Sequence, residues 1–396
     1  MKILSVNAGS SSLKFKMFEM PEEKVIISGR FERIGDKKNS FYSVEVNGEK
    51  EEKKAELGSH SDAVEILIKE LFDNKVIESL DELSAVSHRL VHGGDKYPNS
   101  VILDEDALKA VEGFTDLAPL HVPANVMCVR AFMEKAPNAA QVGCFDTAFH
   151  QTIDKERYIY PVPYEWYENY KVRKYGFHGQ SHKYVAETIG KILNKENVNA
   201  IICHIGQGAS ISAIENGKCI DTSMGFTPNS GVVMGTRSGD IDYGIIKYMM
   251  KVANMTFDEV DNALNKKSGL LGMSKVSNDW RDVDEAITEG NKQAYLAHKI
   301  LVNSIVDYVA RYYVELKGQV DALVFTAGLG ENASHIRRMV VDRLNCLGFE
   351  CDREVNDKTR LGKEGLISTK NSKIPVYVIG TNEELMMARD ALELIK

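Results

Sequence analysis

The sequence predicts an α/β protein built from two duplicated α/β units around a cleft. The first reason is length, because a single hydrophobic core usually stops growing at roughly 250 to 300 residues and this chain has 396. The second is that strands dominate the first part of the chain and then alternate with helices. The third is that the strand, glycine turn and second strand of residues 2–30 recur at 199–221. Two unrelated α/β domains are the alternative.

The N-terminal half begins with strands. Residues 1–60 contain four apolar or alternating runs separated by turn residues, namely ILSV, LKFKMF, KVIISGRF and FYSVEV. Helical periodicity follows in SDAVEILIKELF and ANVMCVRAFMEKA, and each of these segments leads into a predicted strand, LSAVSHRLV or AQVGCFDTAF.

The C-terminal half repeats this pattern. The segment NAIICHIGQGASISAIENGKCID predicts two strands joined by a glycine turn, followed by a hairpin turn. Long helices are expected around 241–252, 256–267 and 291–317. The remaining elements are a strand in DALVFTAGLGEN, a helix from about 334, a strand in IPVYVIG and a final helix from Asn382.

Composition excludes two classes of partner. Hydrophobic residues make up 43% and charged residues 27% of the chain, as in a globular protein, and no apolar run approaches the roughly 20 residues that span a bilayer. The formal net charge is −8 and no basic stripe is present, so neither a membrane nor nucleic acid is an expected partner. Six dispersed cysteines without zinc spacing indicate free thiols in a reducing cytoplasm, and we expect a cytoplasmic protein.

Three turns that carry glycine follow three predicted strands, at Asn7 to Ser12, Gly206 to Ser210 and Ala327 to Asn332. Glycine lets the backbone approach a ligand and point successive N–H groups at phosphate oxygens. None of the three matches the P-loop pattern, and the third does not complete GxGxxG, which argues against a Rossmann site. Each alone is typical of a tight β-turn, but three strand-end turns in a duplicated architecture favour phosphate binding.

The first of these turns lies in ILSVNAGSSSLKF, which can form an ordinary hairpin or a bay of N–H and hydroxyl groups for an anion. We favour the anion bay. Lys14 lies on the exiting strand, where its amine could neutralise a phosphate. A solvated strand lysine is the alternative.

Two arginines are candidates for holding anions. Arg89 in SHRLVHGG follows an apolar run, and Arg237 in MGTRSGDID lies among glycines. A guanidinium group binds two-oxygen anions such as carboxylate and phosphate, so a pair from two lobes suits two reacting anions. Each arginine alone is more often structural. Other polar candidates occupy strand ends, helix starts or proline-bounded turns, namely His121, Asp146, His178 and Glu383. For Glu383 the alternative is a first-turn acid that favours the helix dipole. The residues alone indicate a nucleotide-cleft enzyme.

The ordered motifs VNAGSSSLKF, SHRLVHGG, APLH, FDTAFH, YGFHG, HIGQGAS, DTSMGFTP, VMGTRSGDID, FTAGLGEN and GTNEEL resemble the acetate kinase family, part of the actin, Hsp70 and sugar-kinase superfamily. The resemblance covers essentially the whole chain. It implies two RNase H-like, actin-like ATPase domains, at 1–150 joined by the helix 382–396 and at 151–381. It also implies a homodimer, for which the aromatic segment Tyr158 to Tyr175 is a candidate surface, with a buried loop as the alternative.

The reaction implied by the resemblance is reversible transfer of the ATP γ-phosphoryl group to acetate, which gives acetyl phosphate and ADP and needs Mg²⁺, with Mn²⁺ as a substitute. Acetate is ionised at neutral pH and needs no general base, so catalysis reduces to positioning and charge stabilisation. Arg89 would hold the carboxylate, Asp146 would orient Arg89 or the metal, and Asn7 and Glu383 would lie near magnesium. The groups expected to stabilise the phosphoryl group are Arg237, His178 and His121.

Two further sets follow from the resemblance. ATP and its phosphates would contact Asn7, Ser10, Ser12, Lys14, His204, Gly206, Gln207, Gly208, Gly328, Gly330, Glu331 and Asn332. The methyl group of acetate would contact Val91, Leu120 and Pro228.

The chain departs from the family pattern at two positions. Gln207 replaces the asparagine of HLGNG, and Val122 replaces the asparagine of APLHNP. Gln207 bears on phosphate-donor handling and Val122 on the acetate side; with FTAGLGEN intact, we predict that ATP use is retained. Propionate or butyrate kinase of the same family is the enzyme alternative, and a chaperone-like or filament-forming ATPase is the remote one.

Overall fold

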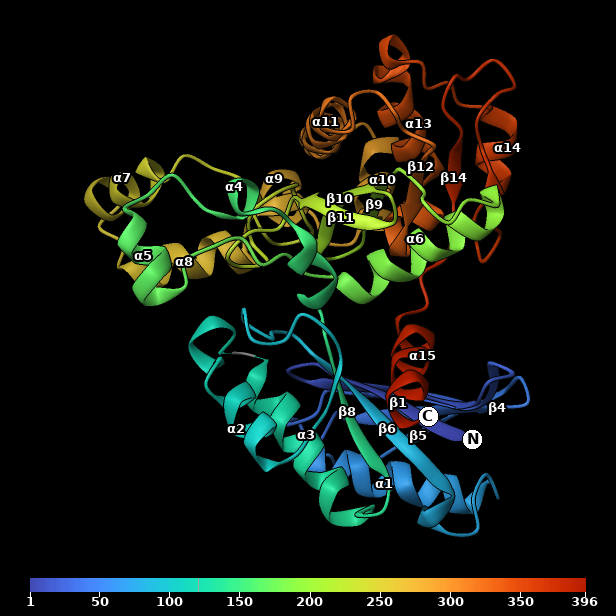
Figure 1. Cartoon of the computed structure of the whole chain (residues 1–396). Coiled ribbons are helices and arrows are strands. Elements are labelled where there is room, and N and C mark those ends of the chain that lie inside the picture. The colour runs from blue at the N-terminus through green and yellow to red at the C-terminus, as the bar shows by residue number, and fades with distance from the viewer. Residues whose placement is uncertain (120) are drawn as a thin grey trace. The chain divides into compact units, whose positions relative to one another are not determined.

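The computed structural model describes residues 1–119 and 121–396, so Leu120 of the expected methyl pocket lies outside the described residues. Packing divides the chain into two units (Figure 1). Unit 1 contains Met1–Phe149 and Asn382–Lys396, and unit 2 contains His150–Thr381. No helix among the described residues is long and apolar enough to cross a membrane.

Unit 1 is built on an eight-stranded sheet with the order β5-β4-β3-β2-β1-β6-β8-β7. The strands β1 to β5 are antiparallel, whereas β6 runs parallel to β1 and β8 runs parallel to β6. Their bounds are β1 Lys2–Ala8, β2 Ser12–Glu19, β3 Lys24–Glu32, β4 Phe41–Val46, β5 Glu49–Lys54, β6 Leu83–Leu90, β7 Val101–Ile102 and β8 Ala140–Phe145.

The stretch from Asn7 to Ser12 closes a β-hairpin. β1 and β2 pair as far as Ala8 opposite Leu13, and the Gly9 N–H donates to the Ser12 carbonyl at 2.8 Å. The preference for an anion bay over a hairpin was therefore wrong about the backbone. The side chain of Ser10 is exposed and that of Ser12 is partly exposed, so their phosphate contacts stay a prediction.

Helices cover both faces of this sheet. Successive side chains of β1 point to opposite faces, and those on each face pack against a different set of helices. Leu4 and Val6 join the core formed with α1 and α3, whereas Ser5 faces α15 and donates to the Glu384 carbonyl at 2.7 Å. The return of the chain through α15 thus completes unit 1. The helices are α1 His60–Asp73, α2 Glu105–Glu112, α3 Val122–Lys135 and α15 Glu383–Ile395.

Unit 2 repeats the sheet topology of unit 1. Its order is β11-β10-β9-β12-β14-β13, in which β9, β10 and β11 are antiparallel and β12 and β14 continue parallel to β9. This matches β1, β2 and β3 followed by β6 and β8, which confirms the duplication. The bounds are β9 Ala200–Ile205, β10 Ala209–Glu215, β11 Lys218–Thr222, β12 Ala322–Thr326, β13 Gly365–Leu366 and β14 Val376–Val378.

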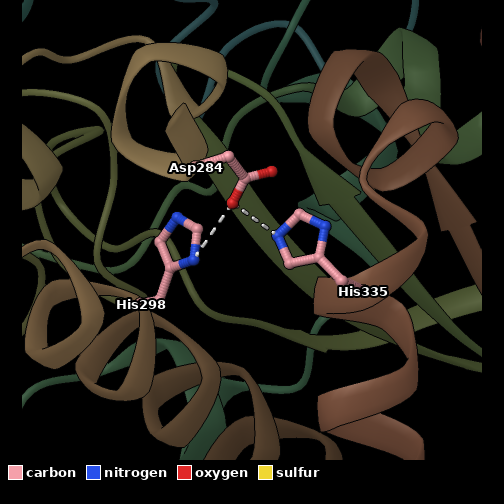
Figure 2. Close-up of side chains that lie close together, drawn as sticks. All are labelled: Asp284, His298 and His335. Atoms are coloured by element: carbon pink, nitrogen blue, oxygen red, sulfur yellow. Dashed lines mark ion pairs between the residues drawn. The ribbon is translucent and has the colours of Figure 1, made fainter. Parts of the chain in front are cut away.

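The helices of unit 2 are α4 Lys155–Tyr158, α5 Tyr164–Tyr170, α6 Gly179–Leu193, α7 Gly244–Val252, α8 Phe257–Lys266, α9 Gly269–Ser274, α10 Trp280–Thr288, α11 Lys292–Glu315, α12 Ala327–Asn332, α13 Ser334–Arg343 and α14 Arg353–Lys358. Helices α6, α11 and α12 pack against this sheet, whereas α5, α7 and α8 lie away from it at one side of the unit (Figure 1). The third predicted glycine turn, Ala327 to Asn332, is instead the short helix α12. Polar side chains of α10, α11 and α13 meet at one point (Figure 2).

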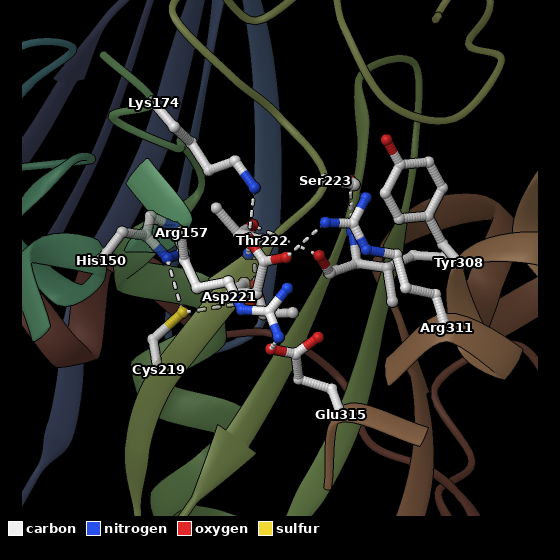
Figure 3. Close-up of polar contacts among 12 residues, drawn as sticks. His150, Arg157, Lys174, Cys219, Asp221, Thr222, Ser223, Tyr308, Arg311 and Glu315 are labelled. Atoms are coloured by element: carbon white, nitrogen blue, oxygen red, sulfur yellow. Dashed lines mark hydrogen bonds and ion pairs between the residues drawn. The ribbon is translucent and has the colours of Figure 1, made fainter. Parts of the chain in front are cut away.

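A buried carboxylate ties α11 to the sheet of unit 2 (Figure 3). Asp221 on β11 is fully buried and pairs with Lys174 and with Arg311, whose Nη2 lies 3.1 Å from Oδ2. Two cations around one buried acid compensate the cost of removing its charge from water. This cluster fixes β11 and so supports the edge of the sheet that carries the second glycine turn.

Candidate active site

Arg89 is the centre of a polar cluster in unit 1. It is the next-to-last residue of β6, a strand whose side chains are mostly buried on both faces, as expected for a central parallel strand. Its guanidinium makes a two-pronged contact with Asp146, with Nε to Oδ1 at 2.9 Å and Nη2 to Oδ2 at 2.5 Å. Its Nη1 donates to Asn7 Oδ1 at 3.2 Å. The side chain of Asp146 is 2% exposed, so the pair holds Arg89 in one orientation.

Glu383 begins α15 beside this cluster. Burial raises its pKa to about 7, helped by the neighbouring acids Asp146 and Glu384 and opposed by Arg89 and Lys14. The protonated form of this carboxyl is therefore favoured more than in an exposed glutamate. A nearby cation would favour the ionised carboxylate, because it would offset part of the cost of burying the negative charge.

The raised pKa of Glu383 makes unit 1 less stable as the pH rises. The folded state binds the proton more tightly than the unfolded chain, so stability falls between about pH 4.5 and pH 7 and is level above that. We expect Glu383→Gln to raise the free energy of unfolding by on the order of 2 kcal/mol at pH 8, after discounting for partial exposure, and by much less at pH 5. Thermal melts in EDTA at both pH values measure this; an equal effect at the two pH values contradicts it.

Val91, an expected substrate residue of unit 1, follows the end of β6. Val91 is buried and its N–H donates to Asn125 Oδ1 at 3.2 Å, while Asn125 Nδ2 donates to the Ala8 carbonyl at 2.8 Å. Asn125 thus ties the ends of β1 and β6 to α3. His121 occupies the N-cap position of α3, one turn before Asn125. Val122 is 1% exposed, as an apolar replacement for asparagine allows.

The second glycine turn, in unit 2, joins β9 to β10. It is tight, because the Gly206 N–H donates to the Gly208 carbonyl at 3.0 Å. The exposed side chain of Gln207 reaches the loop before α10, where its Nε2 donates to the Asn278 carbonyl at 3.2 Å. The longer amide at this position thus links the glycine turn to a neighbouring loop.

His178 and Arg237 meet at Gly208. A Cβ atom added to Gly208 would lie 3.3 Å from His178 Nε2 and 3.5 Å from Arg237 Nη1, so glycine keeps this space open. Arg237 Nη1 also donates to the Pro228 carbonyl at 3.0 Å. The structure therefore brings together three segments that the sequence separates, and Pro228 lies at the guanidinium of Arg237.

A buried polar network orients His178. Its backbone is left-handed, with φ of 60°, an uncommon conformation for a residue with a side chain. Its Nδ1 contacts Ser210 Oγ at 2.9 Å, and the same hydroxyl contacts His182 Nε2 at 2.7 Å. Burial holds the pKa of His182 well below its usual value. His204 stacks on His178 with ring centroids 4.2 Å apart.

His182 was not predicted as a site residue, and Ser210 was predicted only as the last residue of the second glycine turn. His182 follows His178 by four residues, and this helical spacing was the available signal, because it places both rings on one face. Nothing in the sequence places Ser210 on that face.

The helix α12 lines a pocket of about 440 Å³ within unit 2. Gly206 and Gln207 line one part, Gly328 and Asn332 another, and Trp280 and Arg281 a third. A side chain on Gly328 would extend into open space, so the bare backbone is accessible there. Gly330 is buried against the sheet, and Glu331 accepts a hydrogen bond from the Thr381 N–H at 3.3 Å. Gly330 and Glu331 therefore lie on the side of α12 that faces the protein, and neither lines the pocket.

Arg337, which sequence reasoning missed, holds α12 in place. Its guanidinium is fully buried and donates to the carbonyls of Gly330 at 2.9 Å and Glu331 at 2.7 Å. It also donates to the side chain and carbonyl of Asn356, at 2.8 and 2.9 Å, and to the Thr359 carbonyl at 2.7 Å. Burial lowers its pKa to about 10. Five hydrogen bonds match the five donors of the group.

A profile of the Acetokinase family matches residues 2–389. The chain belongs to this family. It is 50% identical over 394 residues to the acetate kinase of Aster yellows witches'-broom phytoplasma (strain AYWB), an alignment that covers 100% of this chain and 95% of the relative. The acetate kinase of Geobacillus sp. (strain WCH70) is 49% identical over 395 residues, covering 99% and 98%.

Two solved structures of family members share the fold. The crystal structure of Porphyromonas gingivalis acetate kinase gives a TM-score of 0.93 at 43% identity, covering 100% of both chains. A propionate kinase from Francisella tularensis subsp. tularensis SCHU S4 gives a TM-score of 0.94 at 41% identity, covering 99% of both chains. The family membership confirms the resemblance and the expected class of duplicated, actin-like ATPase fold.

Proposed function

We propose that this chain is an acetate kinase, which transfers the γ-phosphoryl group of ATP reversibly to acetate and gives acetyl phosphate and ADP. The observation that carries this is a pair of arginines. Arg89 is held by the carboxylate of Asp146 in unit 1, and Arg237 lies beside the glycine turn at Gly208 in unit 2. ATP is the co-substrate of the family. The proposal also takes the two units as the catalytic domains, 1–150 with 382–396 and 151–381.

Arg89 is the proposed carboxylate holder. Its three hydrogen bonds to Asp146 and Asn7 use three of its five N–H donors, so two stay available within the described residues for acetate. Asp146 acts as the orienting residue, because its contacts fix the plane of the guanidinium. Val91, Leu120 and Pro228 are the proposed contacts of the methyl group.

Arg237 and His178 are the proposed stabilisers of the transferred phosphoryl group, with His121 in the same role. In-line phosphoryl transfer spreads negative charge over three oxygens, and fixed donors around them lower the barrier. The open space at Gly208 lets phosphate oxygens approach these donors. The 440 Å³ pocket along Gly328 and Asn332 is the proposed adenosine site, with Ser10, Ser12 and Lys14 as further phosphate contacts.

Asn7 and Glu383 are the proposed neighbours of Mg²⁺, with Mn²⁺ as a substitute. Both offer oxygen atoms, the ligands that Mg²⁺ prefers, and the acids Asp146 and Glu384 lie near Glu383. The bound ion would neutralise phosphate charge.

The substrate range tests this proposal. We expect hydroxamate trapping to show acyl phosphate formation that falls from acetate to propionate to butyrate at saturating ATP, with about 10-fold or more lost per methylene. ATP is expected to exceed GTP and pyrophosphate as donor. Higher turnover with propionate would instead favour the activity named for the Francisella relative, and strong preference for pyrophosphate would overturn the donor assignment.

We also propose a cytoplasmic homodimer. Large aromatic side chains are exposed at the end of α5 and just before α7, with Tyr170 at 70% and Tyr243 at 87%. The aromatic segment Tyr158 to Tyr175 is therefore largely surface in this chain, and aromatic residues are enriched in interface cores. Sedimentation velocity of wild type and Tyr243→Asp tests the dimer, because a charge within the interface should shift the chain towards monomer.

A further inference from the structure

Three polar side chains outside the proposed active site converge in unit 2 (Figure 2). Asp284 comes from α10, His298 from α11 and His335 from α13. His335 Nε2 lies 3.0 Å and His298 Nδ1 lies 3.4 Å from the same oxygen, Oδ1 of Asp284. One ligand atom from each residue lies within 4.8 Å of the others.

Direct hydrogen bonding does not account for this arrangement. His335 Nε2 makes no hydrogen bond among the described residues, although the carboxylate oxygen is 3.0 Å away. His298 is 2% exposed, so its ring lies inside the protein beside this carboxylate. A buried polar atom left without a partner costs free energy, and a metal ion bound to Nε2 of His335 would recover that cost.

The spacing fits a metal ion. With bonds of about 2.0 to 2.1 Å, tetrahedral ligands of Zn²⁺ lie about 3.4 Å apart, and the two distances to Asp284 are 3.0 and 3.4 Å. Two imidazoles with one carboxylate suit Zn²⁺, Co²⁺ or Ni²⁺, whereas Mg²⁺ and Ca²⁺ prefer oxygen ligands. The side chains of Asp284 and His335 are each 30% exposed, which provides an entry path and room for water as a fourth ligand.

We propose that Asp284, His298 and His335 form a site for a divalent transition metal ion, with Zn²⁺ as the reference ion. The ion would tie α10, α11 and α13 together. Trp280, the first residue of α10, lines the 440 Å³ pocket, and its ring lies 6.1 Å from that of His335. The ion would therefore stabilise the packing of the helices next to the pocket. It would take no part in the phosphoryl transfer itself.

Zinc content tests the proposal directly. The purified full chain is stripped with chelator, loaded with Zn²⁺ in excess Mg²⁺ and a phosphine reductant, and dialysed. The variants are Asp284→Asn and His335→Gln, which replace partly exposed ligands and keep side-chain volume. Asp282→Asn is the matched control, because Asp282 is an exposed acid on the same helix.

We expect wild type and Asp282→Asn to retain one more Zn²⁺ per chain than Asp284→Asn and His335→Gln. Zn²⁺ should also raise the Tm of the first two by several degrees and leave the Tm of the other two unchanged. Melts without metal confirm that all four chains fold. Equal zinc content and equal Tm shifts in all four would overturn the site.

Discussion

Replacing Arg237 by alanine is expected to lower kcat by roughly 10²- to 10³-fold, the scale seen when one transition-state donor is removed. The guanidinium lies at Gly208 with His178, where the transferred phosphoryl group is proposed to pass. Its loss should act mainly on kcat, since charge on the phosphoryl oxygens differs most between ground and transition states. Steady-state rates of acyl phosphate formation measure this.

Two variants sharpen that measurement. Arg237→Lys keeps the charge but loses the planar fork, so an intermediate rate is expected. Arg343→Ala removes an exposed arginine of α13 and should keep the wild-type rate. A wild-type kcat in Arg237→Ala with an intact melting transition would remove Arg237 from the proposed mechanism.

Replacing Arg337 by alanine is expected to cost about 3 to 5 kcal/mol of stability, because four carbonyl oxygens and one amide oxygen lose their donor in a buried site. At 2 to 4 °C per kcal/mol for a unit of this size, the Tm of unit 2 should fall by about 10 °C. Nucleotide binding should weaken as well, since α12 lines the pocket. Differential scanning calorimetry and a nucleotide-binding titration measure both effects.

The matched control for Arg337 is again Arg343→Ala, on the same helix. It removes a side chain that is exposed, so its effect should stay within about 0.5 kcal/mol. If Arg337→Ala melted like this control, the five contacts would contribute little and α12 would need another support.

The spacing of apolar residues predicted most helices and strands, because most of them bury one face or both faces in the core. The expected helix at 291–317 is α11, Lys292–Glu315, and the expected final helix from Asn382 is capped by that residue. β5 was missed, since EKEEKK carries no apolar pattern; it is an edge strand held by pairing with β4.

The glycine-rich α12 was missed for a different reason. Glycine disfavours helix, and the support for this one comes from Arg337, which lies beyond the motif in the chain and reaches it only through tertiary packing. The same applies to the active-site candidates. Their residue types and positions at strand ends were visible in the sequence, but the contact of Arg89 with Asp146 spans 57 residues and that of His178 with Ser210 spans 32. Local patterns carry no information about such pairs.

The central claim is that Arg89 holds a carboxylate for phosphorylation while unit 2 supplies the phosphoryl donor. The direct measurement is acetyl phosphate, trapped as hydroxamate, and ADP, counted together for wild type and Arg89→Ala with acetate and Mg-ATP. The account predicts equal amounts of both products in wild type, and at least a roughly 100-fold loss of kcat/KM for acetate in the variant. ADP release without acetyl phosphate in wild type, or an unchanged kcat/KM for acetate in folded Arg89→Ala, would contradict it.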